Sequence, residues 1–235
     1  MSVRVYAGIS LDRDAVARAL PGAILENPIR RDDIYRDYDR GTRCFVIVDG
    51  EFDQSWAVTA GEILDVIRGG SVVFGSSSMG ALRAAEMERF GMIGVGKIFE
   101  LVRRSPLFMD DWLGHLFDPM TLTPITLPFI EVLFALERDL PHPLERAGKK
   151  LVHRHDLRFD MLDRTACHAL VDKLRLRRSA GAKRDLDRLF ARQSPSQKRK
   201  DALALLSTVA RHLARVNQLN RRLRAARPRQ RYTQT

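Results

Sequence analysis

Short apolar segments rich in β-branched residues alternate with segments of strong helix formers over the first 90 residues of this chain. Strands are expected at residues 4–9, 23–26, 43–48 and 71–74, with a helix or turn after each. The third of these segments is continuously apolar, which is typical of a strand buried on both faces. Such alternation with short connections predicts an α/β fold, a Rossmann-like parallel sheet with helices on both faces.

The rest of the chain is expected to form a basic, all-helical region. Helices are predicted at 129–140, 144–176, 183–192 and 196–224. The last of them should pack through a stripe that contains Leu203, Leu206, Val209, Leu213 and Val216. The predicted division is an α/β core domain at 1–118, a proline-rich linker at 119–128, a helical region at 129–226 and a basic tail at 227–235.

The net charge of +11 is unevenly distributed along the chain. Residues 1–140 carry 15 Lys/Arg against 21 Asp/Glu, a balance of −6, whereas residues 141–235 carry 25 against 8, a balance of +17. A basic region attracts any polyanion, so an acidic peptide, an acidic protein surface and nucleic acid stay open as partners. Nucleic acid is the least favoured of these, because few aromatic residues interleave with the C-terminal arginines.

The sequence gives little indication of a membrane span, a metal site or a disulfide bond. The most apolar window, 127–136, is too short to span a bilayer, and the N-terminus has no apolar signal segment, so a cytoplasmic protein is expected. Cys44 and Cys167 lack the spacing of metal ligands and are expected to be buried thiols, and the histidines have no zinc-site spacing. No metal and no cofactor are expected on this chain.

Residues 71–91 are expected to form a strand, a loop and a helix. The loop, Gly-Ser-Ser-Ser-Met-Gly, should leave backbone N–H groups unpaired at the positive end of the helix dipole, where an anion or oxyanion is stabilised. We therefore predict an anion-binding loop made of Gly75, Ser76, Ser77, Ser78 and Gly80. An ordinary turn in which Ser78 caps the helix is the alternative.

Two known loop motifs match this segment only in part. Gly75 and Gly80 have the spacing of a phosphate-binding P-loop, but Ala81 and Leu82 stand where that motif has Lys and Ser/Thr. The nucleophile elbow G-x-S-x-G is not matched, because Met79 replaces its second glycine.

Polar side chains follow each predicted strand. Because ligands of parallel sheets bind at the carboxyl ends of the strands, an acidic, hydroxyl-bearing crevice is expected there. Each acid could instead cap its own loop. The residues concerned are Ser10 and Asp12, Glu26 and Asn27, Asp49, Glu51 and Asp53, and the serines of the loop.

The segments Gly75-Ser-Ser-Ser-Met-Gly-Ala-Leu-Arg-Ala-Ala-Glu-Met87 and Phe90-Gly-Met-Ile-Gly-Val-Gly-Lys-Ile-Phe-Glu100 resemble the TfuA-like family. Shorter matches follow the same order over residues 1 to about 120, at 7–10, 31–35, 48–52 and 62–64. The resemblance departs at Ala60 and Gly61, where the family pattern has a His-Lys pair, and after Asp110-Asp111, where it has a histidine before Gly-Pro.

The resemblance implies a partnership with a YcaO-type cyclodehydratase in peptide backbone thioamidation, as part of the biosynthesis of ribosomally made, post-translationally modified peptides. The YcaO partner would use ATP to activate the amide. The TfuA-like protein would stimulate that partner or deliver sulfide, and one route is hydrolysis of a thiocarboxylated sulfur-carrier protein. The missing histidines and lysine leave a catalytic and a purely assembling role open.

The residues allow two functional hypotheses besides nucleic-acid binding. In a hydrolase, the loop N–H groups would stabilise an oxyanion, Ser77 or water would attack, and Asp49 or Glu62 would act as base. Arg83 and Glu86 are further catalytic candidates, but residues three apart on a helix more often form an ion pair. In an adaptor, the crevice would bind a carboxylate terminus, and the basic helices would hold an acidic leader peptide or partner.

Overall fold

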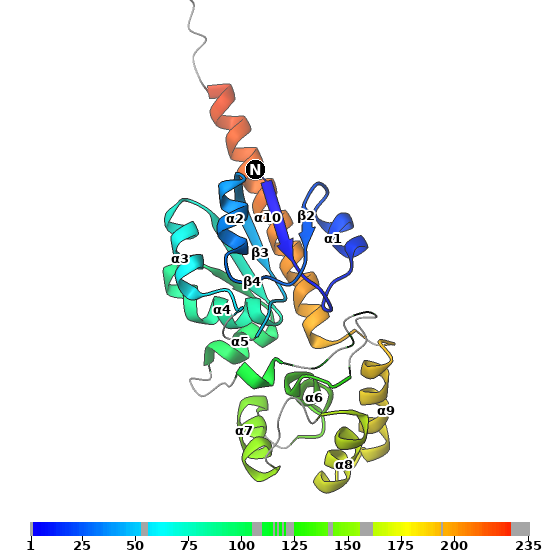
Figure 1. Cartoon of the computed structure of the whole chain (residues 1–235). Coiled ribbons are helices and arrows are strands. Elements are labelled where there is room, and N and C mark those ends of the chain that lie inside the picture. Colours follow the sequence, from blue (N-terminus) through cyan, green and yellow to red (C-terminus); the bar gives the residue numbers. More distant parts are fainter. Residues whose placement is uncertain are drawn as a thin grey trace, which may run out of the picture.

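The computed structural model describes residues 2–52, 56–104, 110–114, 116, 118, 120, 125–140, 143–155, 162–193 and 195–226 (Figure 1). The predicted basic tail, Asp53 and half of the proline-rich segment lie outside this range. Five strands form one sheet: β1 (Ser2–Tyr6), β2 (Ile24–Glu26), β3 (Thr42–Ile47), β4 (Val72–Ser76) and β5 (Ile93–Val95). Every pairing is parallel and the order is β2-β1-β3-β4-β5. The predicted parallel α/β sheet is confirmed.

The fifth strand was not expected from the sequence, since its segment is rich in glycine. Gly94 lies in the middle of β5, and a Cβ atom there would come within 2.2 Å of the Phe99 ring. The glycine therefore lets the following helix, α5 (Lys97–Arg104), pack directly onto the strand.

Helices cover both faces of the sheet. Successive side chains of each strand point to opposite faces, so apolar side chains on both faces need to be covered. In β3, Phe45 and Ile47 belong to one apolar cluster, and Cys44 and Val46 belong to the other. The first cluster is covered by α2 (Asp33–Asp39), α3 (Ala60–Arg68) and α4 (Met79–Met87), and the second by α1 (Arg13–Ala19) and α10 (Gln197–Ala226). Both cysteines are buried as expected, and burial raises the pKa of the Cys44 and Cys167 thiols to about 12.

The remaining helices differ in their bounds from those that the sequence pattern suggested. They are the 3₁₀-helices η1 (Glu88–Phe90) and η2 (Asp110–Trp112), and the α-helices α6 (Phe129–Ala135), α7 (Leu144–His155), α8 (Arg164–Leu174) and α9 (Ser179–Phe190). The single helix predicted over 144–176 is wrong. Asp163 accepts a hydrogen bond from the backbone N–H of Ala166, and this cap starts a new helix at Arg164. None of the described helices is both long and apolar enough to cross a membrane.

Helix α10 returns from the helical part to the sheet and runs along it (Figure 1). Its buried apolar side chains are Ala202, Leu205, Leu206 and Val209, whereas Leu203 is 39% exposed. The predicted stripe is therefore wrong at Leu203, because α10 presents its 202–205–209 side to the sheet, where it contacts β4 and β5. Its last turns extend beyond the sheet. The helical region thus supplies a layer of the α/β core.

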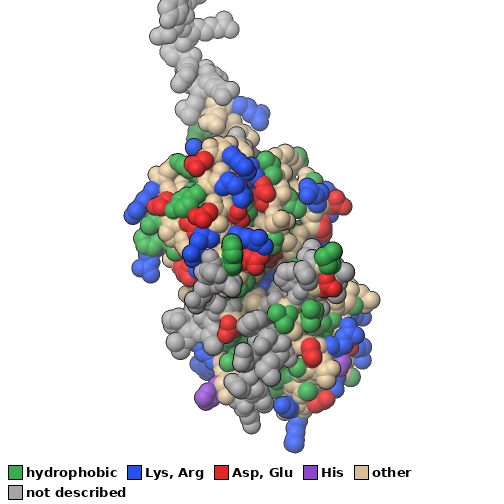
Figure 2. All heavy atoms as spheres, viewed as in Figure 1, with side chains coloured by type: hydrophobic (Ala, Val, Ile, Leu, Met, Phe, Trp, Pro, Cys, Tyr) green, Lys and Arg blue, Asp and Glu red, His purple; other side chains and the backbone are tan. Residues whose placement is uncertain are grey.

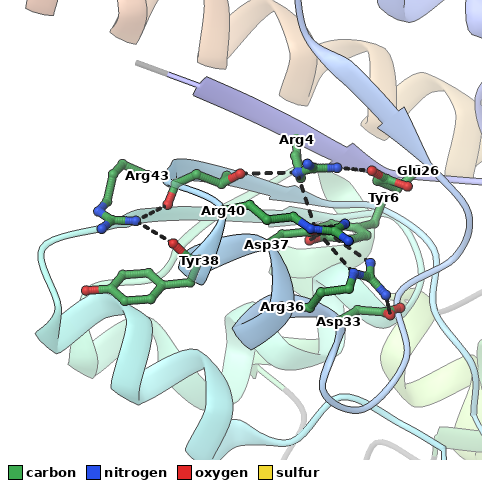
Figure 3. Close-up of polar contacts among 10 residues, drawn as sticks. Arg4, Tyr6, Glu26, Asp33, Arg36, Asp37, Tyr38, Arg40 and Arg43 are labelled. Carbon is green, nitrogen blue, oxygen red and sulfur yellow. Dashed lines mark hydrogen bonds and ion pairs between the residues drawn. The ribbon is translucent and has the colours of Figure 1, made fainter.

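A buried carboxylate joins α2 to the strand β1 (Figure 3). The side chain of Asp37 is fully buried and accepts a 2.7 Å hydrogen bond from the Tyr6 hydroxyl. Arg4 and Arg36 form ion pairs with it at 3.5 and 3.2 Å. Burial opposes ionisation of Asp37, but these partners outweigh it and lower the pKa of the carboxyl below its usual value.

Candidate functional site

The predicted loop connects β4 to α4 through a strained turn. Ser77 has a φ of +72°, in the left-handed region that residues other than glycine rarely adopt. Ser76, Ser77 and Ser78 are all buried. A serine at positive φ between a strand and a helix is the backbone arrangement of a nucleophile elbow, although the G-x-S-x-G pattern is not matched.

Gly80 allows the start of α4 to approach β3 closely, as the second glycine of the G-x-S-x-G motif would otherwise do. A Cβ atom on Gly80 would lie 1.9 Å from the carbonyl oxygen of Ile47, at the end of β3. A Cβ on Gly75 would lie 2.2 Å from the carbonyl oxygen of Gly80. Both glycines are therefore required for α4 to begin directly against the sheet.

The predicted set of free loop donors is smaller than expected. The N–H of Ser78 donates to the carbonyl oxygens of Ser76 at 2.9 Å and Val48 at 3.3 Å. The N–H of Gly80 also donates to Val48, at 3.3 Å. The predicted capping by the Ser78 side chain is absent, since this hydroxyl makes no cap hydrogen bond with α4. Some of the backbone N–H groups that were predicted to bind an anion are thus used to hold the turn.

Three side chains from different strand ends form one hydrogen-bonded series. Ser77 Oγ donates to Ser10 Oγ at 3.3 Å, and Ser10 Oγ donates to Asp49 Oδ1 at 2.6 Å. The other oxygen of Asp49 accepts the backbone N–H groups of Gly8 at 2.9 Å and Ser10 at 3.0 Å. The buried carboxylate therefore orients the loop after β1 and, through Ser10, the Ser77 hydroxyl.

A lysine from α10 reaches the same loop from the other side. Lys198 is 4% exposed, and its Nζ donates to Ser78 Oγ at 3.1 Å and to the Leu113 carbonyl oxygen at 2.6 Å. Burial lowers the pKa of Lys198 to about 8, although the negative charges of Asp49 and Glu131 oppose this shift. No local sequence pattern indicates this residue, because 120 positions separate it from Ser78.

Glu131 of α6 fixes the start of α10. Its carboxylate accepts the backbone N–H groups of Gln197 at 2.8 Å and Lys198 at 2.6 Å, which the first turn of a helix leaves unpaired. The carboxylate is buried, and burial raises its pKa. Glu131 thus positions the backbone of Lys198 beside the serine loop.

A cavity of about 450 Å³ lies against this group of residues. Ser10 and Asp12 line it from the loop after β1, Glu131 from α6, and Lys198 and Arg199 from α10. The cavity is at the carboxyl edge of the sheet, where the connections after β1 and β3 lead to opposite faces. Ligands of doubly wound sheets bind at such a position.

The other predicted site residues have structural partners. Glu62 forms a capping box with Thr59 at the start of α3 and also accepts the backbone N–H of Asp32 at 2.6 Å. Arg83 pairs with Glu86 at 2.6 Å and donates to the Val58 carbonyl oxygen, so the ion-pair alternative is confirmed for these two. Of the proposed catalytic residues, the structure brings together Asp49 and Ser77, whose link runs through Ser10.

The remaining acids of the crevice mostly serve the fold. Asp12 caps α1 and pairs with Arg199 at 2.6 Å, so it also closes one side of the cavity. Glu26 pairs with Arg4, and Glu51 pairs with Arg30 at 3.0 Å. The described residues contain no group of three or more His, Cys, Asp or Glu side chains that could hold a metal.

These features define a doubly wound α/β protein with a serine-bearing turn and a buried carboxylate at the carboxyl edge of its sheet. The model of the family described as TfuA-like protein matches residues 49–154. The match supports the family that the resemblance in the sequence indicated, although it covers 49–154 and the resemblance covered 1 to about 120. The matched segment contains Asp49, the serine loop and Glu131. Ser10 and Lys198 lie outside the matched segment. No curated protein matches the chain.

Proposed function

We propose that this protein acts with a YcaO-type cyclodehydratase in peptide backbone thioamidation and supplies sulfide by hydrolysing a thiocarboxylated sulfur-carrier protein. The observation that carries the proposal is the series from Ser77 through Ser10 to the buried Asp49 carboxylate. A hydroxyl is a weak nucleophile until a base accepts its proton, and this series leads from the hydroxyl of Ser77 to such a base. The family assignment supports the choice of pathway.

The strained turn has a defined part in this chemistry. The positive φ of Ser77 fixes the direction of its Cα–Cβ bond, and its buried hydroxyl donates to Ser10. The adjoining cavity, which Ser10 lines, would receive the acyl terminus of the carrier. ATP would act on the YcaO partner, and no nucleotide is assigned to this chain.

We expect Ser77→Ala and Asp49→Asn each to lower the rate of sulfide release from a thiocarboxylated carrier by about a hundredfold or more. The double variant should lose little more than either single one, because the two groups act as one unit. Sulfide release and thioamide formation in the reconstituted pathway are the measurements. Ser207→Ala, at an exposed position of α10, is the matched control and should be unchanged. Wild-type rates in both site variants would refute the proposal.

An adaptor function is the second candidate, and the outer half of α10 favours it. This part of the helix extends beyond the sheet (Figure 1), and its exposed side chains include Arg211, Arg215, Arg221, Arg222 and the 57%-exposed Leu219. On the rest of the face shown in Figure 2, basic and acidic side chains are interspersed. The projecting helix is therefore the best-defined basic surface for an acidic partner protein or leader peptide.

Charge reversal on the projecting helix tests this candidate. We expect the triple variant Arg211→Glu, Arg215→Glu and Arg221→Glu to weaken capture of the YcaO partner or the precursor peptide, and wild-type capture to fade as salt is raised. Arg68→Glu, exposed on α3 and on the opposite face of the sheet, is the control. Salt-independent capture, or equal capture by the triple variant, would exclude α10 as the docking surface.

A further inference from the structure

Lys198 is an unusual neighbour for a serine loop because its ammonium is buried beside neutral acceptors. A buried charge is costly unless it is paired or hydrogen-bonded. The two hydrogen bonds of Nζ go to a hydroxyl, of Ser78, and to a carbonyl, of Leu113. Among the described residues, no carboxylate oxygen lies within ion-pair distance of this ammonium, and Asp49 and Glu131 act on it through space. Packing alone would not select a lysine here.

The serine turn lacks the donor that a nucleophile elbow normally uses. In such an elbow, the backbone N–H of the residue after the nucleophile stabilises the oxyanion. Here that N–H belongs to Ser78 and already donates to the carbonyl oxygens of Ser76 and Val48. A hydrolytic site built on Ser77 therefore needs a positive group or donor from another element.

Lys198 has the position and the donors to meet this need. It lines the cavity together with Ser10, and Ser77 lies one hydrogen bond behind Ser10. An ammonium carries three N–H donors, and the neutral partners of Nζ leave its charge available to an incoming anion. A cation at a site of low dielectric stabilises a developing oxyanion strongly and needs no reorganisation during the reaction.

We propose that the Lys198 ammonium stabilises the oxyanion that forms when Ser77 attacks the acyl carbon of the substrate, and that Lys198 is thus a catalytic residue. The inference rests on the proposed function. The Ser77 oxygen forms a bond to the carbon while its proton passes through Ser10 to Asp49, and the carbonyl electron pair moves onto oxygen beside Lys198. When this oxyanion collapses, the carbon–sulfur bond breaks, and sulfur leaves with the bonding electrons and takes up that proton as hydrosulfide. Water then hydrolyses the acyl-serine.

The same geometry selects a class of substrate. A thiocarboxylate carries a negative charge before the reaction, and the Lys198 ammonium would attract it to the inner end of the cavity. Arg199 at the cavity wall is neutralised by its ion pair with Asp12. Lys198 donates a hydrogen bond directly to Ser78 of the serine loop, and its charge is therefore the one that an anion at the loop would meet. Acyl groups without a charged leaving atom should bind more weakly than thiocarboxylates.

The pH dependence separates this function from a structural one. The charged groups that face Lys198 are Asp49 at the end of β3 and Glu131 of α6, and the lysine's lowered pKa of about 8 already includes their effect. The ammonium is present below this pKa and is lost as pH rises through it. We therefore expect the rate of the wild-type reaction to fall as pH rises through about 8.

The experiment compares Lys198→Met and Lys198→Arg with the wild type over pH 6–10, with sulfide release from a thiocarboxylated carrier as the readout. Lys198→Met should lose about a hundredfold or more in rate. Lys198→Arg keeps its charge throughout this range, so it should retain activity without the fall above pH 8. Lys173→Met, exposed on α8, is the control. A wild-type profile in Lys198→Arg, or a wild-type rate in Lys198→Met, would overturn the inference.

A second readout keeps the inference separate from the proposed function. Covalent labelling of Ser77 by a fluorophosphonate, followed by mass spectrometry, requires no carrier and passes through a similar anionic intermediate. If the wild type releases no sulfide, the proposed function fails, and the labelling rates of the wild type and Lys198→Arg still decide the role of Lys198. If sulfide is released but both variants keep the wild-type profile, only the role of Lys198 fails. Thermal unfolding of each variant identifies any loss of rate that is due to misfolding.

Discussion

Gly80→Ala is expected to destabilise the protein by at least about 3 kcal/mol, more than an ordinary overpacked core substitution. The new Cβ atom would lie 1.9 Å from the carbonyl oxygen of Ile47 and 2.6 Å from its carbonyl carbon. Both are backbone atoms of the central sheet, so no side chain can rotate away to relieve the clash. Either α4 separates from β3 or the turn around Ser77 rearranges. The free energy of unfolding, measured by urea titration, should fall, and sulfide release should fall with it.

Gly61→Ala is the matched control for this substitution. Gly61 lies in the first turn of α3, where an added Cβ would have Thr59 Oγ1 as its nearest neighbour at 3.8 Å, an ordinary contact. Alanine is favoured over glycine in helices by up to about 1 kcal/mol, so this variant should be as stable as the wild type or slightly more so. Equal stability of the two variants would contradict the close approach of the loop to Ile47.

Asp37→Ala is expected to cost about 3–5 kcal/mol, the usual effect of removing one partner from a buried ion pair. The substitution would leave the Tyr6 hydroxyl without its acceptor and the Arg4 guanidinium without one of its two carboxylate partners (Figure 3). Asp39→Ala, at an exposed position of the same helix, should stay within about 0.5 kcal/mol of the wild type. Urea titration at pH 7 measures both, and similar losses in the two variants would argue against the Asp37 network.

The pH dependence of stability provides a second measurement of the same network. Because the folded-state pKa of Asp37 is lowered, the ionised carboxylate stabilises the fold at pH values above its unfolded pKa, about 3.9. This contribution is lost as pH falls below that value and through the lower folded-state pKa. The wild type should therefore lose more stability between pH 5 and pH 2 than Asp37→Ala. Equal losses would show that another group governs acid unfolding.

Local patterns in the sequence led to much of the fold. The β-branched segments identified four of the five strands, since side chains that fit a buried pleated surface are recognisable without their neighbours. The strand β5 was not predicted, because glycine disfavours strands. Gly94 is needed there to leave room for the Phe99 ring, and composition does not reveal this contact. The 144–176 segment was read as one helix because periodicity continues across the position where Asp163 restarts it.

The candidate site was predictable where it depends on topology. The carboxyl ends of neighbouring parallel strands share one edge, so Ser10, Asp49 and the serine loop were expected to be close to each other, and hydrogen bonds join them. Glu62 was a plausible base by composition alone. Its pairing with Thr59 has the spacing of a capping box, and this pattern places Glu62 at the start of α3.

From its residues alone, the chain revealed the strand and helix order, the serine loop after β4 and the resemblance that the family match supports. These depend on short-range patterns, in which each residue's partner is only a few positions away. Three-dimensional packing was needed to place Lys198 at that loop, to place Glu131 at the start of α10 and to hold Ser77 at positive φ. Their partners are tens of residues away or more, or belong to the backbone of another strand. The contacts of Lys198 and Glu131 exist only because α10 returns across the sheet, and no periodicity or spacing in the chain encodes that return.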